Sequence, residues 1–342
     1  MGFGFIAENG HVPAYRTSDE LEVVAVADIC AARREAAARA LPNARIYASH
    51  VELLERERGA IEFVDVTTPP YVHATVARAA LEAGCHVLCE KPLTTTLDDA
   101  RMLVALAESK RRVLFPSHNY KHAPVVRRVR SILASGALGR PHLATLSTFR
   151  TTHARGVAEW RESWRRERRF AGGGIAMDHG AHTFYLAFEW LGAHPTSITA
   201  KMTSSDGLDT EDTFSGTLTF PNGALAMVNL TWTSGFRKVI YTLHGEHGAL
   251  RIEDDALELV TSEGTIRDTI SSNWMDASHA GWFASLFRQL THAIDARTWV
   301  GSETLDALRC VELVATAYAS SRDGSRELVL PSAIRPRLAA GE

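Results

Sequence analysis

The sequence lacks several features that would place the chain in a special class. No apolar run approaches the roughly 20 residues needed to span a bilayer, so we expect no membrane helix. The chain does not open with a basic segment followed by a long apolar stretch, so we expect no signal peptide and a cytoplasmic location. Only four cysteines occur in 342 residues, without a disulfide or zinc-ligand pattern, which favours reduced, buried thiols. Lys and Arg number 37 against 40 Asp and Glu, with no basic tail or stripe, so nucleic acid is not an expected partner.

What is present is a globular composition, with 45% hydrophobic residues, enough for two domains with cores of their own. The first 120 residues alternate short β-branched, apolar runs with helix-forming segments, which predicts βαβ units and a parallel sheet. Gly84 follows one of these helices and is a good residue to end it. The expected strands are 21–28, 46–47, 61–67, 86–89 and 113–116, and the expected helices are 9–15, 31–41, 50–58, 71–83 and 97–109.

The pattern changes after residue 120. A predicted helix over 125–135 is followed by segments such as HLATLSTFR and ALAMVNLTW, in which apolar and polar residues nearly alternate. Turns containing glycine, such as Pro-Asn-Gly at 221–223, separate them, which predicts an antiparallel sheet with one open face. Helices are expected over 280–297 and 302–321. We therefore expect an α/β protein with a Rossmann-type domain over 1–120 and an α+β domain with a large, mainly antiparallel sheet over 121–342.

The chain opens with Gly2, Gly4 and Ala7 in the G-x-G-x-x-A spacing of a loop that holds a dinucleotide pyrophosphate. Such a loop normally follows a central strand, and the roughly five apolar residues of that strand are missing before Gly2. A start site placed too late, a shortened chain or a true loss of the strand would each explain this. For the chain as written we expect a disturbed sheet centre and weakened affinity for NAD.

Asp28 ends the next predicted strand, 26 residues after Gly2. A carboxylate near that spacing binds the ribose hydroxyls of NAD, although Asp28 could simply cap the helix that follows it. Arg33 and Arg34 come shortly afterwards and could face a 2′-phosphate. The sequence therefore favours NAD and leaves NADP open.

Two further motifs follow predicted strands at their carboxyl ends, where open α/β sheets bind ligands. In TTPPYVH, Thr67 and Thr68 offer hydroxyl groups and the prolines stiffen the turn. An ordinary strand-turn-helix connection without a ligand would show the same pattern. In CEKPL, Glu90 and Lys91 directly follow an apolar strand, where charges are costly to bury without partners. Lys91 is expected to point into the crevice beside a nicotinamide, and a solvated Glu–Lys pair is the alternative.

The segment GGGIAMDHGAH places Asp178 and His182 four residues apart, on one face of a predicted helix. A carboxylate that steadies an imidazole is a general-base arrangement, although a buried structural hydrogen bond would look the same. His179 should point elsewhere. No third ligand at helical spacing completes a metal site, so no metal is expected.

Together these motifs resemble the glucose–fructose oxidoreductase, inositol dehydrogenase and MocA-like family over nearly the whole chain. The resemblance rests on G-F-G-F-I-A with a following His11, on T-T-P with His73, and on E-K-P. It also rests on Gly172-Gly173-Gly174 with Asp178, Gly180 and His182, and it continues through Trp190-Leu191-Gly192. It implies a catalytic set of Lys91, Asp178 and His182. The expected cofactor-binding residues are Gly2, Gly4, Phe5, Ile6, Ala7, Asp28, Thr67, Thr68, Pro69, His73, Glu90 and Lys91.

The implied activity is NAD(P)-dependent hydride transfer between a nicotinamide and a hydroxyl-bearing carbon of a sugar, cyclitol or related polyol. The implied assembly is a homodimer or homotetramer formed through the C-terminal sheet. A non-catalytic sugar or cofactor sensor and an NAD-dependent glycoside-cleaving enzyme are the alternatives. Arginines and tryptophans of 160–169 could form a lid over the substrate or only a solvated loop. Expected substrate contacts are Asn119, Tyr120, His153, Trp160, Trp164 and His179.

Overall fold

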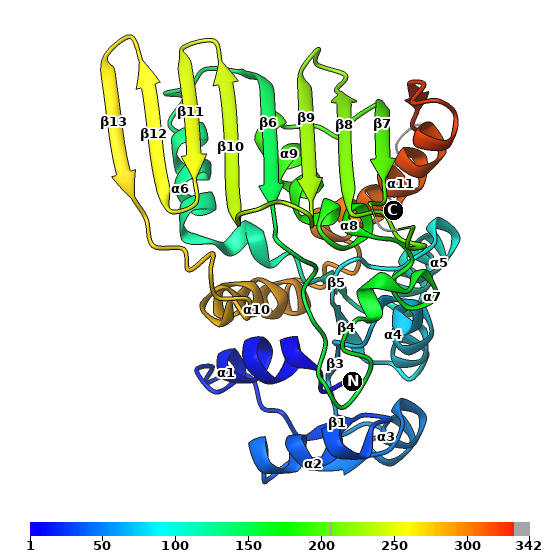
Figure 1. Ribbon diagram of the computed structural model, residues 1–342. Coiled ribbons are helices and arrows are strands. Elements are labelled where there is room, and N and C mark those ends of the chain that lie inside the picture. Colours follow the sequence, from blue (N-terminus) through cyan, green and yellow to red (C-terminus); the bar gives the residue numbers. More distant parts are fainter. Residues whose placement is uncertain (206, 332–342) are drawn as a thin grey trace, which may run out of the picture.

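The computed structural model describes residues 1–205 and 207–331. Two groups of strands organise it (Figure 1): short parallel strands in the first third of the chain, and one large sheet in the rest. Within the described ranges, no helix combines the length and apolar content needed to cross a membrane.

The first group confirms the alternation expected from the sequence. Strand β1 (Ala25–Ala27) pairs in parallel with β2 (Arg45–Tyr47), and β4 (His86–Cys89) pairs in parallel with β3 (Phe63–Val66) and β5 (Leu114–Pro116). All four residues of β4 are buried, as expected for a parallel strand covered on both faces. The intervening helices are α2 (Ala31–Ala40), α3 (His50–Arg56), α4 (His73–Glu82) and α5 (Leu97–Lys110).

The centre of this parallel arrangement is divided, as expected. Strands β1–β2 and β3–β4–β5 form separate sheets, and within the described residues no strand joins β1 to β3. Met1 and Gly2 bridge them instead: the Gly2 amide donates to the Ala27 carbonyl at 2.8 Å, and the Thr67 amide donates to the Met1 carbonyl at 2.9 Å. The Gly loop is thereby fixed between the two carboxyl ends where a ligand would sit. A weakened affinity for NAD stays a prediction.

The loop leads into a helical segment formed by the π-helix η1 (Ala7–His11) and α1 (Val12–Tyr15), two residues earlier than expected at its start. Gly2 has φ +85°, and a Cβ there would lie 3.0 Å from the Thr68 backbone nitrogen. Only glycine fits this turn without strain. At Gly4 an added Cβ would meet nothing within 4 Å, so this backbone faces open space.

The second half contains a nine-stranded sheet in the order β13-β12-β11-β10-β6-β9-β8-β7-β14. Only β6 and β9 pair in parallel; the other neighbours are antiparallel. The strands are β6 (Pro141–Phe149), β7 (Ser197–Thr203), β8 (Thr213–Thr219), β9 (Leu225–Thr231), β10 (Lys238–Gly245), β11 (Gly248–Glu253), β12 (Ala256–Thr261), β13 (Gly264–Thr269) and β14 (Leu328–Val329).

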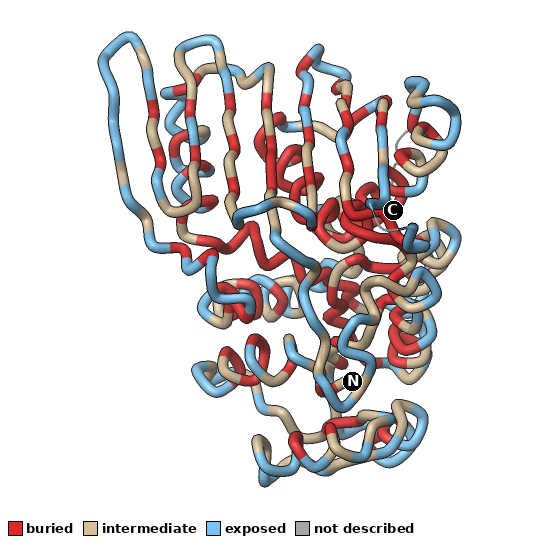
Figure 2. Tube along the Cα trace, viewed as in Figure 1, coloured by how far each residue is buried: buried red, intermediate tan, exposed pale blue. Residues whose placement is uncertain are grey.

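One face of this sheet is covered and the other is open. Helices α6 (Pro124–Ala134), α9 (Gly180–Leu191) and α11 (Ser302–Arg322) pack behind it (Figure 1). Buried and more exposed residues therefore alternate along its strands (Figure 2). In β9, for example, Ala226, Val228 and Leu230 are buried, whereas Leu225 and Met227 are exposed. The alternation in the sequence predicted this open face.

The last helices return to the first half of the molecule. Helix α10 (Ala280–Asp295) packs Phe283 and Phe287 into one core with Tyr15 and Leu88. Helix α11 contributes Leu308 to the core of the β3–β4–β5 sheet and other residues to the core of the large sheet. The boundary at residue 120 stays a prediction of where the chain passes between the sheets, and the C-terminal helices belong to both cores.

Candidate active site

A cleft of about 840 Å³ lies between the two halves. It is lined by the Gly loop, by the turns after β3 and β4, by the short helix α8 (Ile175–Asp178) with the start of α9, and by the segment after β6. Eighteen of the twenty predicted site residues line it: Gly2, Gly4, Phe5, Ile6, Asp28, Thr67, Thr68, Pro69, Glu90, Lys91, Asn119, Tyr120, His153, Trp160, Trp164, Asp178, His179 and His182.

Two predicted cofactor contacts do not line the cleft. Ala7 is buried in a small apolar cluster with Phe3 and Val26, so it packs the helix onto the core. His73 is buried, and its ring nitrogens face the Thr68 carbonyl at 2.7 Å and the Pro92 carbonyl at 2.9 Å. His73 therefore ties the T-T-P turn to the E-K-P turn, and its predicted contact with the cofactor stays a prediction that this position does not favour.

The half of the cleft beside the Gly loop fits a dinucleotide. Gly4 exposes its backbone there, and Thr68 Oγ1 is buried without a hydrogen-bond partner among the described residues. Asp28 accepts hydrogen bonds from the amides of Phe3 at 2.6 Å and Cys30 at 2.7 Å. Its carboxylate thus fixes the loop and the start of α2, and each oxygen keeps a further acceptor site for a ribose hydroxyl.

The two arginines that could have faced a 2′-phosphate are engaged elsewhere. Arg33 is buried and forms ion pairs with Glu8 and, at 3.5 Å, with Glu159. Arg34 donates to the carbonyls of Asp28 and Ile29. Because both guanidinium groups already have acceptors, this end of the cleft is suited to NAD.

Beneath the Gly loop, a buried network steadies Glu90. His11 lies 2.7 Å from an Asp65 oxygen and 3.1 Å from a Glu90 oxygen, and Ser117 also donates to Glu90. Burial lowers the pKa of His11, but Asp65 and Glu90 outweigh burial and raise it to about 9. His11 is therefore an imidazolium at neutral pH and compensates the carboxylates buried beside it.

Lys91 and Asp178 meet across the cleft from opposite halves of the molecule. Lys91 Nζ donates to the Asp178 carbonyl at 2.7 Å and to its carboxylate at 3.1 Å. Arg165 lies 3.2 Å from the same carboxylate oxygen. Burial raises the pKa of Asp178, but Lys91 and Arg165 outweigh burial and hold the pKa below its usual value. Asp178 is thus an anion that positions the Lys91 ammonium.

His182 is oriented by Tyr185, not by Asp178 as the spacing predicted. Helix α8 ends at Asp178 and α9 begins at Gly180, so the two side chains do not share one continuous helix. The Tyr185 hydroxyl lies 2.7 Å from His182 Nδ1 and accepts from the Tyr120 amide at 3.2 Å. The Tyr120 ring also stacks on the His182 ring, with centroids 3.9 Å apart.

This arrangement leaves Nε2 of His182 without a protein partner in the described part of the chain. Burial and the nearby Lys91 charge lower the pKa of His182 well below its ordinary value, so the imidazole is neutral at pH 7. His179, one of the expected substrate contacts, also lines the cleft, and its buried Nε2 has no partner among the described residues.

The segment between β6 and α7 (Arg168–Ala171) extends from the large sheet toward the N-terminal strands and back (Figure 1). Its Trp160 and Trp164 line the cleft, and its Glu159 contacts Arg33 on the other side. That this segment covers the substrate stays a prediction.

Sequence reasoning missed several residues of the cleft. Arg150 follows β6, Arg237 precedes β10, and Trp232, Met275 and His279 lie nearby in the lining. The position of Arg150 and Arg237 at strand ends was readable from the sequence, but the pairing of those strands was not. Tyr185 was also missed, although its spacing of three residues from His182 on a helix was a usable signal.

Sequence comparisons identify the family. Residues 1–118 match the model of an oxidoreductase family with an NAD-binding Rossmann fold, and residues 126–251 match the model of the GFO/IDH/MocA C-terminal domain. D-apiose dehydrogenase of Paraburkholderia graminis is 28% identical over 339 residues, which cover 95% of this chain and 87% of that protein.

Two other proteins extend the comparison. The 1,5-anhydro-D-fructose reductase of Ensifer adhaerens is 35% identical over 195 residues, 56% of each chain. The crystal structure of GenD2 from gentamicin A biosynthesis in complex with NAD superposes with a TM-score of 0.82 at 25% identity, covering 97% of this chain and 95% of that one. The protein described here belongs to the glucose–fructose oxidoreductase, inositol dehydrogenase and MocA family of NAD-binding oxidoreductases.

Proposed function

We propose that this enzyme transfers hydride between NAD and the hydroxyl-bearing carbon of a sugar, cyclitol or related polyol. The observation that carries the proposal is that the Gly loop, Lys91 and His182 line one cleft. Lys91 comes from the parallel-sheet half and His182 from the other half, so the site needs both. The names of the relatives, a D-apiose dehydrogenase and an anhydrofructose reductase, support a carbohydrate substrate.

The chain's own groups handle the proton of the substrate hydroxyl. When bound, the nicotinamide supplies the hydride acceptor. Neutral His182 accepts the hydroxyl proton at Nε2, while Nδ1 stays on the Tyr185 hydroxyl, which can both donate and accept. The Lys91 ammonium, positioned by Asp178, stabilises the negative charge that develops on the same oxygen. In the reverse direction His182 returns the proton to the reduced carbonyl.

Residues around Lys91 and His182 also support hydride transfer. The segment 150–167 with Trp160 and Trp164 covers the cleft and limits the access of water. Asn119 Oδ1 is buried and unpartnered among the described residues, so it is a ready acceptor for a substrate hydroxyl. Tyr120 holds the His182 ring by stacking, and we assign it to positioning as well as to substrate contact.

We extend the proposal to assembly and location. The open face of the large sheet carries exposed Leu225 and Met227, and we propose that it pairs with a second copy in a homodimer or homotetramer. Three of the four free cysteines are buried, which suits a reducing cytoplasm.

Reduction of NAD by a panel of polyols tests this function. We expect some members of a panel of hexoses, pentoses and inositols, tested together with their acids and phosphate esters, to produce the absorbance of reduced nicotinamide. Lys91→Met should lower kcat/KM on the order of 100-fold or more, because it removes the charge and keeps the length. Lys201→Met, at an exposed position of β7, is the matched control. Normal turnover by Lys91→Met, or NAD binding without reduction by any polyol, would contradict the proposal.

A further inference from the structure

The cleft contains two arginines whose charges are not compensated. Five arginines line it, and three have carboxylate partners: Arg33 with Glu8 and Glu159, Arg155 with Glu162, and Arg165 with Asp178. Arg150 and Arg237 form no ion pair with any described residue. Arg150 Nη1 is in addition buried without a hydrogen-bond partner.

The fold brings these two guanidinium groups together. Strands β6 and β10 are antiparallel, with Phe149 opposite Lys238. Continuing that register by one residue sets Arg150 opposite Arg237, and both side chains line the cleft. Like charges directly opposite each other in a sheet are destabilising. Burial and the charge of Arg150 lower the pKa of Arg237, which agrees with this proximity.

The unpartnered groups around the arginines belong to the substrate end of the cleft. His179 Nε2 and His279 Nδ1 are buried and unpartnered within the described ranges, and both rings flank Tyr120 at 5.6 Å between centroids. Of the carboxylates that line the cleft, Asp178 is paired with Lys91 and Arg165, Glu90 with His11, and Asp28 lies beside the Gly loop, at the end proposed for the cofactor. Asp254, whose charge also acts on Arg237, is paired with Lys238 at 3.3 Å. This end of the cleft therefore has an excess of positive charge that the chain itself does not neutralise.

We propose that the substrate is an anionic sugar or polyol, and that Arg150 and Arg237 bind its carboxylate or phosphate. This inference rests on the proposed function, since it takes the cleft as a substrate site. Guanidinium groups match the planar, two-oxygen geometry of such anions. A bound anion would offset the repulsion between the two guanidinium groups. The cost of holding both arginines side by side is therefore recovered when the substrate binds.

Matched substrate pairs test the proposal. D-Glucose is compared with D-glucuronate, D-galactose with D-galacturonate, and D-glucose with its 6-phosphate, each with NAD. We expect kcat/KM to favour the acid or the phosphate ester, and the better of these two identifies the anion. Arg150→Gln and Arg237→Gln should each raise KM for the anionic member on the order of 10- to 100-fold, as loss of a charge-assisted hydrogen bond predicts. The neutral member should change little.

A binding experiment separates this proposal from the proposed function. Titration of D-glucuronate by calorimetry, with and without NADH, should give an affinity that falls with salt and with either substitution. Failure to bind NADH would contradict the proposed function and still leave the anion titration readable. Arg140→Gln, which removes an arginine paired with Glu246 at the opposite end of β6, is the control.

Folding of the variants can be judged independently. Because each substitution removes a like-charge contact, Arg150→Gln and Arg237→Gln should unfold at the wild-type temperature or above it. Equal kcat/KM for neutral and anionic partners, or a ratio that neither substitution changes, would overturn the proposal.

Discussion

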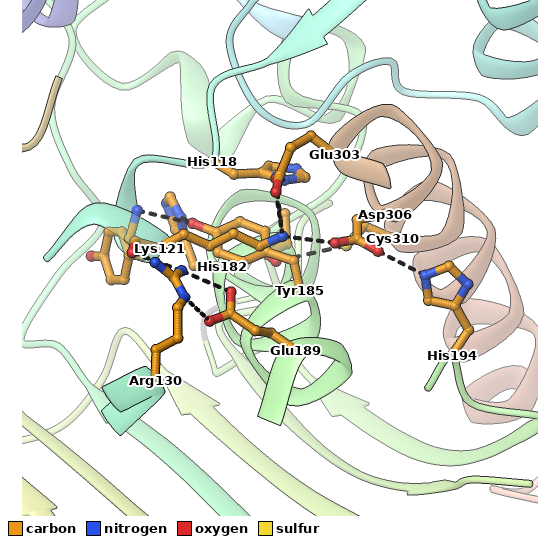
Figure 3. Close-up of polar contacts among 12 residues, drawn as sticks. His118, Lys121, Arg130, His182, Tyr185, Glu189, His194, Glu303, Asp306 and Cys310 are labelled. Atoms are coloured by element: carbon orange, nitrogen blue, oxygen red, sulfur yellow. Dashed lines mark hydrogen bonds and ion pairs between the residues drawn. The ribbon is translucent and has the colours of Figure 1, made fainter. Parts of the chain in front are cut away.

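Two cavities of similar size differ in the state of their polar groups. The cleft measures about 840 Å³, and a second cavity of about 740 Å³ lies on the far side of Tyr185. Figure 3 shows titratable side chains of this second cavity that pair with one another. They are Lys121, Arg130, Glu189, His194, Glu303 and Asp306.

These titratable side chains of the second cavity are paired with one another. Lys121 Nζ lies 2.9 Å from Glu303 and 2.7 Å from Asp306, and His194 reaches Asp306 at 2.7 Å (Figure 3). Arg130 binds Glu189 through two hydrogen bonds. No described side chain that lines this cavity has a buried polar atom without a partner. We therefore interpret the network as a structural tie among η3 (Asn119–His122), α6, α9 and α11.

The cleft leaves its polar atoms open. Thr68 Oγ1, Asn119 Oδ1, His179 Nε2 and Arg150 Nη1 are all buried without partners in the part of the chain described. Six of the eleven such atoms in the described residues belong to side chains that line the cleft. Buried polar groups are nearly always paired in native proteins, so this concentration indicates a bound ligand. The comparison teaches that unsatisfied polar atoms, rather than volume, distinguish a binding site from a structural cavity.

Replacing one histidine in each cavity should give the largest difference between the two cavities, measured as the loss of kcat. His182→Ala should lower kcat on the order of 100- to 10,000-fold, the usual contribution of a general base. His194→Ala, in the second cavity, should leave kcat within a factor of about two, because nothing there touches substrate. Steady-state kinetics of both variants tests this prediction. Equal losses of kcat in the two variants would show that His182 is not the general base.

Removing the cation of the second cavity should reduce stability rather than activity. Lys121→Met leaves Glu303 and Asp306 partly buried without the Lys121 cation; the loss approaches the cost of about 3–5 kcal/mol for breaking a buried pair. Urea unfolding measures the loss. The triple variant Lys121→Met/Glu303→Gln/Asp306→Asn should recover most of it, and a single variant as stable as wild type would contradict the structural role.

Acid should affect both cavities alike. Burial lowers the pKa of His279, in the cleft, and of His122, in the second cavity, to about 4. Below their unfolded value near 6.5 the unfolded chain binds more protons, so stability falls as the pH drops from 6.5 toward 4. Each group contributes up to about 3 kcal/mol over that window.

Unfolding measured across this pH range provides the check. His279→Gln and His122→Gln should each flatten the dependence of the unfolding free energy on pH. If the slope of each variant equals that of wild type, the two rings are not buried in neutral form.

The smallest effect concerns Tyr185, the side chain between the two cavities. Tyr185→Phe removes the partner of His182 Nδ1 and should lower kcat about 10-fold, with little change in KM. The acidic limb of the pH profile should also move, because the hydroxyl no longer interacts with the imidazole. Tyr241→Phe, whose hydroxyl contacts Thr148, is the control. A profile that coincides with wild type would limit Tyr185 to packing.

The sequence predicted the parts of the site that depend on local order. The apolar strands followed by T-T-P and E-K-P place Thr67, Glu90 and Lys91 at one sheet edge, because carboxyl ends of parallel strands meet there. The G-G-G segment correctly brought Asp178 and His182 into the same cleft. The predicted contact between these two side chains does not form: α8 ends at Asp178, α9 begins at Gly180, and His182 contacts Tyr185 instead.

The rest depends on long-range pairing that a single sequence does not reveal. Arg150 and Arg237 become neighbours only through the register of β6 and β10. The second cavity forms because α11 returns to Lys121 from 182 residues away. His73 sits inside a recognisable motif, but whether its ring faces the cleft or the core depends on packing.

A crystal structure with NADH and D-glucuronate tests the central claim most directly. We predict that the sugar lies in the cleft, with one oxygen within hydrogen-bond distance of both Lys91 Nζ and His182 Nε2 beside the nicotinamide. A ligand in the second cavity, or a substrate oxygen that reaches neither of these two nitrogens, would contradict the account.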